Sequence, residues 1–374
     1  MSFDKGNISF RIFYLKNGLS EPSLDRFAEH AAPALDTLGT SPVRGWVSWR
    51  HLLDRDVSPK TCLFTHWYHV AVLQAEKKVP PKLLSAYCRQ EEDAVTRAEN
   101  LQFVNRKQKA EIKKRVFEQL QPQMPPTLLG LPVVANLHTN FVLADAMTSA
   151  NMDKFSLLFR ETTGEQPYVV TPNGLAILRK QVNANDLAPA VFTDDETVEP
   201  DAACDLGLEF LTWLWFRFEQ DGCAFKSRIG ASCSCLLEGP VTFFREGKGA
   251  HEALLRKGDP LRSPEAALAV LCGKKMRSVK LSLAIADKAW TATLDSSFAI
   301  RGLKLPKDPE NQHPPFEERM TDVETFTNTL FDLFDIFLAA RADKRAWAKC
   351  EKEVRAWARR RAEEDRQGTG AEEE

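Results

Sequence analysis

The sequence predicts an α+β protein with mixed or antiparallel sheets and helices packed against them. Apolar residues alternate along Ile8–Tyr14, as in a half-buried strand. Two short apolar runs, Val133–Asn136 and Phe141–Ala146, flank a polar turn, and a helical pattern over Ser149–Arg160 follows them. This β-β-α order, with a further strand at Pro167–Thr171, is typical of an antiparallel-containing sheet with helices on one face.

The elements between these strands follow from the positions of the prolines. A second strand is expected within Thr61–Ala75. Pro80-Pro81 opens a long helix over about Lys82–Leu101, because proline is tolerated in a first helical turn. A basic helix comes next and should end near Gln121, because Pro122 cannot continue it.

The C-terminal part begins with a helix signal at Ser263-Pro264-Glu265, which has a capping residue, a proline and an acid in order. Gly273 should stop this helix. Thr321–Glu324 reads as a capping box that starts a final helix, whose apolar spacing continues past Trp357. Strands are expected between the two helices, near Val279–Ile285, Trp290–Leu294 and Phe298–Leu305.

The middle of the chain has two contrasting segments. Asp186–Asp205 is acidic with few large apolar residues and is expected to be a linker. Leu206–Phe218 is dense in aromatic residues, and periodicity does not decide between a strand and a buried helix. The resulting regions are an N-terminal α+β region with a basic projection at 1–180, the linker and aromatic-rich insertion at 181–255, a C-terminal α+β region at 256–320, and a long helix with a basic second half and acidic tail at 321–374.

Composition restricts the class of protein. The 374 residues include 50 Lys and Arg against 52 Asp and Glu, and 43% of them are hydrophobic, which is enough for a folded core. No apolar run is long enough for a membrane span, and the N-terminus has no export signal. Eight cysteines without a repeating framework suit reduced thiols, so we expect a cytoplasmic protein.

The basic residues gather in separate segments, although the chain as a whole is nearly neutral. Val104–Arg115 contains six cations and one acid, whereas Asp186–Glu209 contains eight acids and no cation. Such segregation favours a face built for a polyanion, although any single basic run is usually a solvated surface. The candidate DNA-binding residues are Arg106, Lys107, Lys109, Lys113, Lys114, Arg115, Arg256, Lys257, Arg262, Lys274, Lys275 and Arg277.

Motifs for catalysis are weak. The sequence lacks a glycine-rich phosphate loop, and Cys233-x-Cys235 is too closely spaced for a usual zinc pair, so we expect no metal and no cofactor. One alternative is a Mg²⁺-dependent nuclease that uses Asp201, Glu246 and Lys248. A second is a protein-interaction module that docks a partner through an exposed aromatic segment at residues 206–218.

Several segments together resemble the bacterial recombination-associated RdgC family. They are Glu76–Pro80 before the long helix, the Leu120-Gln121-Pro122 turn, the strand–turn–strand PVVANLHTNFVLADA, and the C-terminal series SPEAALAVLCGKK, VKLSLAI and IRGLKLP. The resemblance covers roughly residues 1–180 and 255–340. Family members carry a basic residue and a Phe after the Leu-x-Pro turn, whereas this chain has Gln123-Met124-Pro125-Pro126. Residues 193–249 resemble an insertion, and the basic helix beyond Arg341 extends past the family's end.

The resemblance implies a non-enzymatic protein with an extended, crescent-shaped subunit and a ring-like homodimer lined with positive charge. Such a protein would bind double-stranded and single-stranded DNA without sequence preference. It would antagonise RecA-type recombinase during recombination or replication, and it would be cytoplasmic and nucleoid-associated. The basic residues within 106–115 and within 256–277 would then contact DNA phosphates. Such contacts position a protein without reading bases, so little sequence preference is expected.

Overall fold

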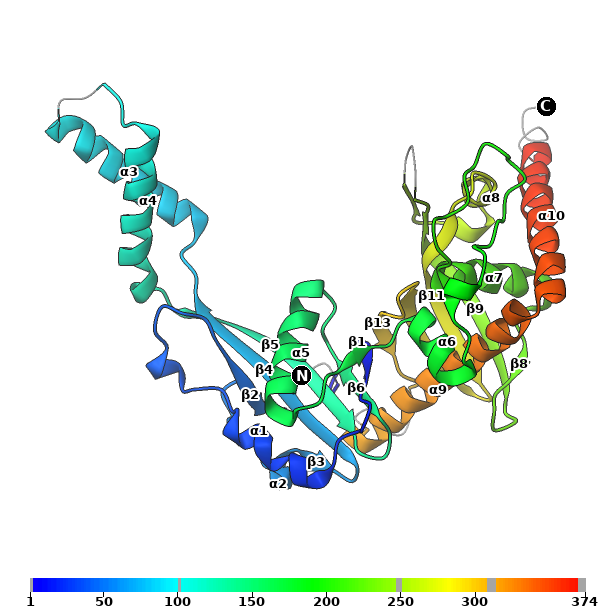
Figure 1. Cartoon of the computed structure of the whole chain (residues 1–374), viewed down its shortest axis with the longest axis horizontal. Helices are drawn as coiled ribbons and strands as arrows, with labels where there is room; N and C mark the ends of the chain where they lie inside the picture. Colours follow the sequence, from blue (N-terminus) through cyan, green and yellow to red (C-terminus); the bar gives the residue numbers. More distant parts are fainter. Residues whose placement is uncertain (1–2, 100–101, 247–250, 308–313, 369–374) are drawn as a thin grey trace. The chain divides into compact units, whose positions relative to one another are not determined.

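A computed structural model describes residues 3–99, 102–246, 251–307 and 314–368 of the chain. It divides into two compact units (Figure 1). The first comprises Leu15–Asn140 and Thr148–Pro167, and the second comprises Ser2–Tyr14, Phe141–Met147 and Tyr168–Glu374. Both units combine antiparallel strands with helices, so the predicted α+β class is confirmed.

The first unit is built on the antiparallel order β2-β4-β5, with β3 pairing the start of β4. Trp46 on β2 lies in its core, where the indole Nε1 donates to Thr162 Oγ1 at 2.7 Å and the ring contacts Phe27. The elements of this unit are η1 Glu21–Ser23, α1 Asp25–Glu29, η2 Leu35–Thr37, β2 Val43–Ser48, α2 Pro59–Cys62, β3 Leu63–Phe64, β4 Trp67–Lys77, α3 Pro81–Ala98, α4 Arg106–Leu120, η3 Gln121–Gln123, β5 Pro126–Asn136 and α5 Ser149–Thr163.

The second unit contains the strand order β10-β9-β11-β12-β13-β1-β6, with β7 on β1 and β8 on β9. Helix α7 packs on β9 and β11, and α10 packs on α7, α8 and α9. Its elements are β1 Ile8–Tyr14, β6 Phe141–Ala144, β7 Tyr168–Val169, α6 Pro172–Lys180, η4 Ala184–Asp186, α7 Leu206–Asp221, β8 Phe225–Lys226, β9 Ser232–Phe244, β10 Glu252–Leu255, η5 Pro260–Arg262, α8 Pro264–Leu271, β11 Lys275–Ile285, β12 Lys288–Asp295, β13 Ile300–Lys304, α9 Phe316–Ala342 and α10 Lys344–Gly368.

The aromatic-rich segment forms α7, and its side chains fill the core of the second unit. Phe210 contacts Phe298, Phe334 and Phe337, with ring centroids 5.2 to 5.9 Å apart. Asp205 caps the helix by accepting from the backbone N–H groups of the first turn. The sequence did not distinguish a strand from a helix here. A helix that is buried on all sides has no polar face, so its sequence shows no helical periodicity.

The C-terminal helix differs from the prediction in where it starts and in that it is interrupted. Helix α9 begins at Phe316 rather than after Thr321, whose hydroxyl donates to Glu317 O inside the helix. The helix is also not continuous, because it ends at Ala342 and α10 begins at Lys344. Asp343 separates the two by accepting from the N–H groups of Arg345 and Ala346, which is the capping interaction of a new helix.

The acidic segment expected to be a linker is packed against the second unit. Phe192 within it is 2% exposed and lies against Trp347. Two of its carboxylates form ion pairs: Asp194 pairs with Arg355 and Arg359 of α10, and Asp201 pairs with Lys275. A segment held in this way is a strap on the fold, and the expectation of a flexible connection is wrong.

Within the part of the chain that the structure describes, no helix is both long and apolar enough to cross a membrane.

Candidate nucleic-acid interface

The basic run of the first unit forms α4, which pairs with α3. A capping box starts the helix: Asn105 Oδ1 accepts from the N–H of Gln108, and Gln108 Oε1 accepts from the N–H of Asn105. The two helices share a small apolar core of Val79, Cys88, Val104, Ile112, Val116 and Leu120. Because the apolar residues recur every four positions on α4, all six cations of the run remain exposed.

Two of these six cations face α3 and serve the helix pair. Lys109 lies 3.1 Å from Glu92, and Arg115 lies 2.6 Å from Glu91. These pairs are partly solvated and stabilise the two helices by about 0.5 kcal/mol each.

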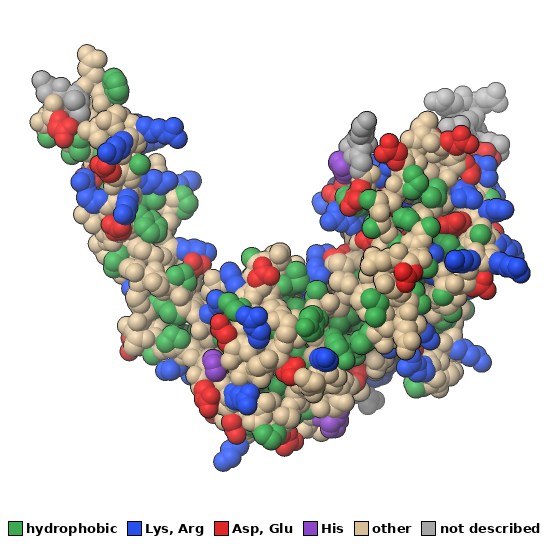
Figure 2. Space-filling view, in the orientation of Figure 1, with side chains coloured by type: hydrophobic (Ala, Val, Ile, Leu, Met, Phe, Trp, Pro, Cys, Tyr) green, Lys and Arg blue, Asp and Glu red, His purple; other side chains and the backbone are tan. Residues whose placement is uncertain are grey.

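The other four cations form one stripe on the solvent side of α4. Arg106, Lys107, Lys113 and Lys114 occupy positions i, i+1, i+7 and i+8, which share one side of a helix over about 12 Å. Lys114 approaches the exposed Glu118 only at 3.9 Å, and the other three form no ion pair with any described residue. We call these four residues the α4 stripe. Figure 2 shows Lys and Arg side chains spread over the α3–α4 pair.

The α4 stripe is unfavourable for the helix itself. Arg106 and Lys107 stand in the first turn, where the helix has its positive end and acidic residues are preferred. Neither cation compensates a described carboxylate. The packing of α3 and α4 therefore gives these two cations no structural role within the described residues.

The residues of the second predicted cluster lie on the loops that flank β10 and α8 and at the start of β11. Arg256 and Lys257 follow β10, Arg262 precedes α8 and pairs with Asp259 at 3.4 Å, and Lys274 follows α8. These side chains are fully or partly exposed.

Lys275 is not available to a ligand. Its side chain is 5% exposed, donates to Asp201 at 2.6 Å and lies over the ring of Phe192. It is buried with its neighbour Met276 where β11 begins, next to an irregularity in the register with β9. Its predicted role as a DNA contact is therefore corrected to a buried ion pair.

Sequence reasoning missed a set of polar residues on the sheet of the second unit. One side of β9 and β11 is buried and apolar, with Leu237, Val241 and Leu281 among its residues. The opposite side carries polar residues in two cross-strand rows. The first row is Glu238, Lys280, Thr293 and Arg301; the second is Ser282, Thr291 and Lys304, which ends at the exposed apolar Leu236. We call this side the open sheet face.

The cations of the open sheet face are partly neutralised. Lys280 pairs with Glu238, and Arg301 lies 2.9 Å from Asp295. Lys304 is exposed and forms no ion pair with a described residue. Arg277 stacks on Phe244 at 4.8 Å and lies beside a polar hollow of about 360 Å³ that also includes Arg301. Polar and apolar residues alternate along β11 and β12, and this pattern could have indicated the surface. The residues that lie side by side on it follow only from the strand register.

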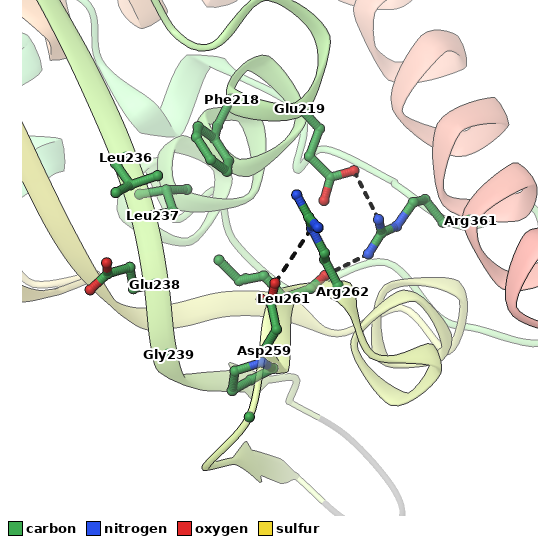
Figure 3. A pocket seen from close by; sticks show the side chains of 12 residues that line it. Phe218, Glu219, Leu236, Leu237, Glu238, Gly239, Asp259, Leu261, Arg262 and Arg361 are labelled. Carbon is green, nitrogen blue, oxygen red and sulfur yellow. Dashed lines mark hydrogen bonds and ion pairs between the residues drawn. The ribbon is translucent and has the colours of Figure 1, made fainter.

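A larger cleft of about 820 Å³ lies between the end of α7, β9, the loop 258–262 and α10 (Figure 3). Arg361 reaches into it, donates to Leu261 O at 2.6 Å and lies 3.5 Å from Glu219. Glu219 also accepts from the indoles of Trp215 and Trp357. The lining has three carboxylates, Glu219, Glu238 and Asp259, against the two cations Arg262 and Arg361, so the cleft does not favour a polyanion.

The geometry gives little support to the nuclease alternative. Asp201 is engaged by Lys275, Glu246 follows β9 at the surface, and Lys248 lies outside the described residues. Among the residues that the structure does describe, no three His, Cys, Asp or Glu side chains come together as a possible metal site.

The aromatic segment is equally unsuited to the docking role. Trp213 is 3% exposed and Trp215 is 0% exposed. The interaction-module alternative requires these indoles at the surface. Because both are buried, they cannot dock a partner in this structure.

Comparison with known proteins gives no assignment: no protein-family model matches the chain, and no curated protein matches it. The resemblance to the RdgC family stays a prediction that the segments quoted above carry.

Proposed function

We propose that this protein binds DNA without sequence preference and acts by occupying it, as the resemblance to RdgC-type proteins implies. The observation that carries the proposal is the α4 stripe, in which three of four exposed cations have no described ion-pair partner. Phosphate groups supply the missing negative charge and also suit the positive end of the helix.

The residue types of the α4 stripe favour contacts with the phosphate backbone of DNA. Lys and Arg on one side of a short helix neutralise phosphates, which occur regularly on any DNA sequence. The neighbouring Asn105 and Gln108, residue types that can read adenine edges, are engaged with each other's backbone in the capping box. The open sheet face adds Lys304 and Arg301 as further phosphate contacts in the second unit.

The finer parts of the proposal are a ring-like homodimer and antagonism of a RecA-type recombinase. A closed ring would retain DNA topologically, so that moderate phosphate contacts would suffice for long residence. A protein that covers the DNA backbone would compete with recombinase filaments for the same polymer. Neither step requires catalysis by this chain.

A mobility-shift titration on circular and linear duplexes of the same sequence tests the proposal. We expect binding that weakens steeply with salt, is equal for unrelated sequences, and leaves the DNA intact with or without Mg²⁺. A preference for circles that persists at high salt would support topological retention. Absence of binding at low salt would overturn the proposed function, and cleavage that requires Mg²⁺ would favour the nuclease.

A further inference from the structure

Helix α10 exposes a second row of cations along its outer side. Trp347, Val354 and Trp357 turn inward, where they are at most 4% exposed. The opposite side carries five basic residues over about 22 Å of helix, and Figure 2 shows Lys and Arg side chains along this edge of the second unit. These five residues, which we call the α10 stripe, are Arg345, Lys349, Lys352, Arg359 and Arg360.

Apart from Arg361 in the cleft, the fold accounts for the cations on one flank of α10 only. Arg355 and Arg359 lie 3.0 and 3.2 Å from the carboxylate of Asp194 in the acidic strap. Arg355 also donates to Val191 O at 2.9 Å. These contacts fasten the strap to the helix and involve just one member of the stripe.

The remaining members of the stripe are not explained by packing. Arg345, Lys352 and Arg360 form no ion pair within the described residues, and Lys349 has only a solvated contact with Glu353 at 3.6 Å. Arg345, Lys349 and Lys352 are spaced by four and three positions, where like charges on a helix repel. This repulsion destabilises the helix slightly. An anionic partner bound to the stripe would offset the repulsion between the cations.

The surroundings of the stripe are shaped for a long, negatively charged partner. Ala348 and Ala356 lie among the cations, and Glu353, beside Lys349, is the one acid of α10 that forms an ion pair with the stripe within the described residues. Towards the C-terminal end, a groove of about 510 Å³ lies between α7 and α10; Arg217 and Arg360 line it together with a single acid, Glu353, and Phe216 and Trp357 lie in its wall. Regular cations beside an open groove fit a nucleic-acid backbone.

The α10 stripe and the open sheet face lie on opposite sides of the second unit. Helix α7 covers the apolar side of β9 and β11, and α10 packs on α7 and α8, outside that layer. We propose that the α10 stripe is a separate DNA-binding surface, so that the protein holds two DNA segments at once; this inference rests on the proposed function for the first of the two.

A two-duplex capture experiment with the full chain tests this inference. One duplex is fixed to beads, protein is added and washed, and a labelled duplex of unrelated sequence is supplied at low salt. We expect the wild type to retain the labelled duplex. The R345E/K349E/K352E/R360E variant should retain at least tenfold less of it, while its binding to the fixed duplex falls less than threefold.

Two further variants separate charge at this place from general effects. The K5E/K16E/K60E/K226E variant makes the same change in net charge at exposed lysines elsewhere, and it should capture like the wild type. The R345Q/K349Q/K352Q/R360Q variant removes the repulsion, so it should melt no lower than the wild type and still lose capture.

The outcomes distinguish the inference from the proposed function. Capture that is unchanged in both α10 variants, or a wild type that binds the fixed duplex and captures no second one, would overturn the inference and leave the proposed function intact. A wild type that does not bind even the fixed duplex would contradict the proposed function, and the inference with it. Capture of a labelled acidic polypeptide in place of DNA would also overturn the inference.

Discussion

Lys275 and Asp201 are 74 positions apart in the sequence, yet the ammonium group of one lies 2.6 Å from the carboxylate of the other. This contact accounts for two candidate residues at once. It removes Lys275 from the DNA-binding set and engages the Asp201 carboxylate of the nuclease alternative. It also fastens the acidic strap to the start of β11.

Breaking this pair should destabilise the protein without affecting DNA binding. Asp201→Ala leaves a buried ammonium group unpaired, and we expect the free energy of unfolding to fall by about 3 kcal/mol. Adding Lys275→Met should recover most of that loss, because a long apolar side chain needs no partner. Urea unfolding of the two variants measures both effects, and a loss of DNA binding at unchanged stability would show that Lys275 contacts DNA after all.

His69 predicts how stability depends on pH. Its side chain is fully buried on β4 and stacks on Trp49, and burial lowers its pKa to about 3. The unfolded chain takes up a proton near pH 6.5, so stability contributed by the neutral imidazole is present above that pH and is lost as the pH falls towards 3. Between pH 7.5 and pH 5 the contribution lost should be about 2 kcal/mol.

The comparison of His69→Leu with the wild type isolates this effect. Denaturant unfolding at the two pH values should show a smaller loss in the variant. An equal loss in both proteins would mean that other groups cause the acid sensitivity.

Trp215 predicts the consequence of burying the aromatic segment. The indole is fully buried, donates to Glu219 at 2.9 Å and contacts Trp357. Trp215→Ala should lower the free energy of unfolding by about 4 kcal/mol through the cavity and the lost hydrogen bond. Tryptophan fluorescence should correspondingly show indoles shielded from aqueous quenchers, and strong quenching in the native protein would restore the docking interpretation.

The sequence was most informative where one residue type determines the local structure. Pro122 set the end of α4 near Gln121, and the structure ends that helix at Leu120. Ser263 and Pro264 placed the start of α8, which begins at Pro264. Thr321 misled because a Thr followed by an acid also occurs inside helices, where the hydroxyl can donate to a carbonyl one turn earlier.

The site could be predicted only in part, for a related reason. Exposure of the α4 cations follows from the spacing of Ile112, Val116 and Leu120. Which of those cations have partners depends on α3, and the sequence does not specify how two helices rotate against each other. The open sheet face depends on the register of β11 with β9 and β12, where irregularities near Ser278 displace the alternation.

The central claim is that the α4 stripe contacts DNA phosphates while its neighbours on the same helix support α3. The most direct test is the salt dependence of DNA affinity for R106Q/K107Q/K113Q/K114Q against the matched control K16Q/K60Q/K109Q/R115Q, which removes the same charge. We predict that the stripe variant loses roughly 4 units from the slope of log affinity against log salt, whereas the control keeps the wild-type slope. Equal slopes for the two variants would contradict the claim, because they would show that the protein's net charge, rather than this stripe, governs binding.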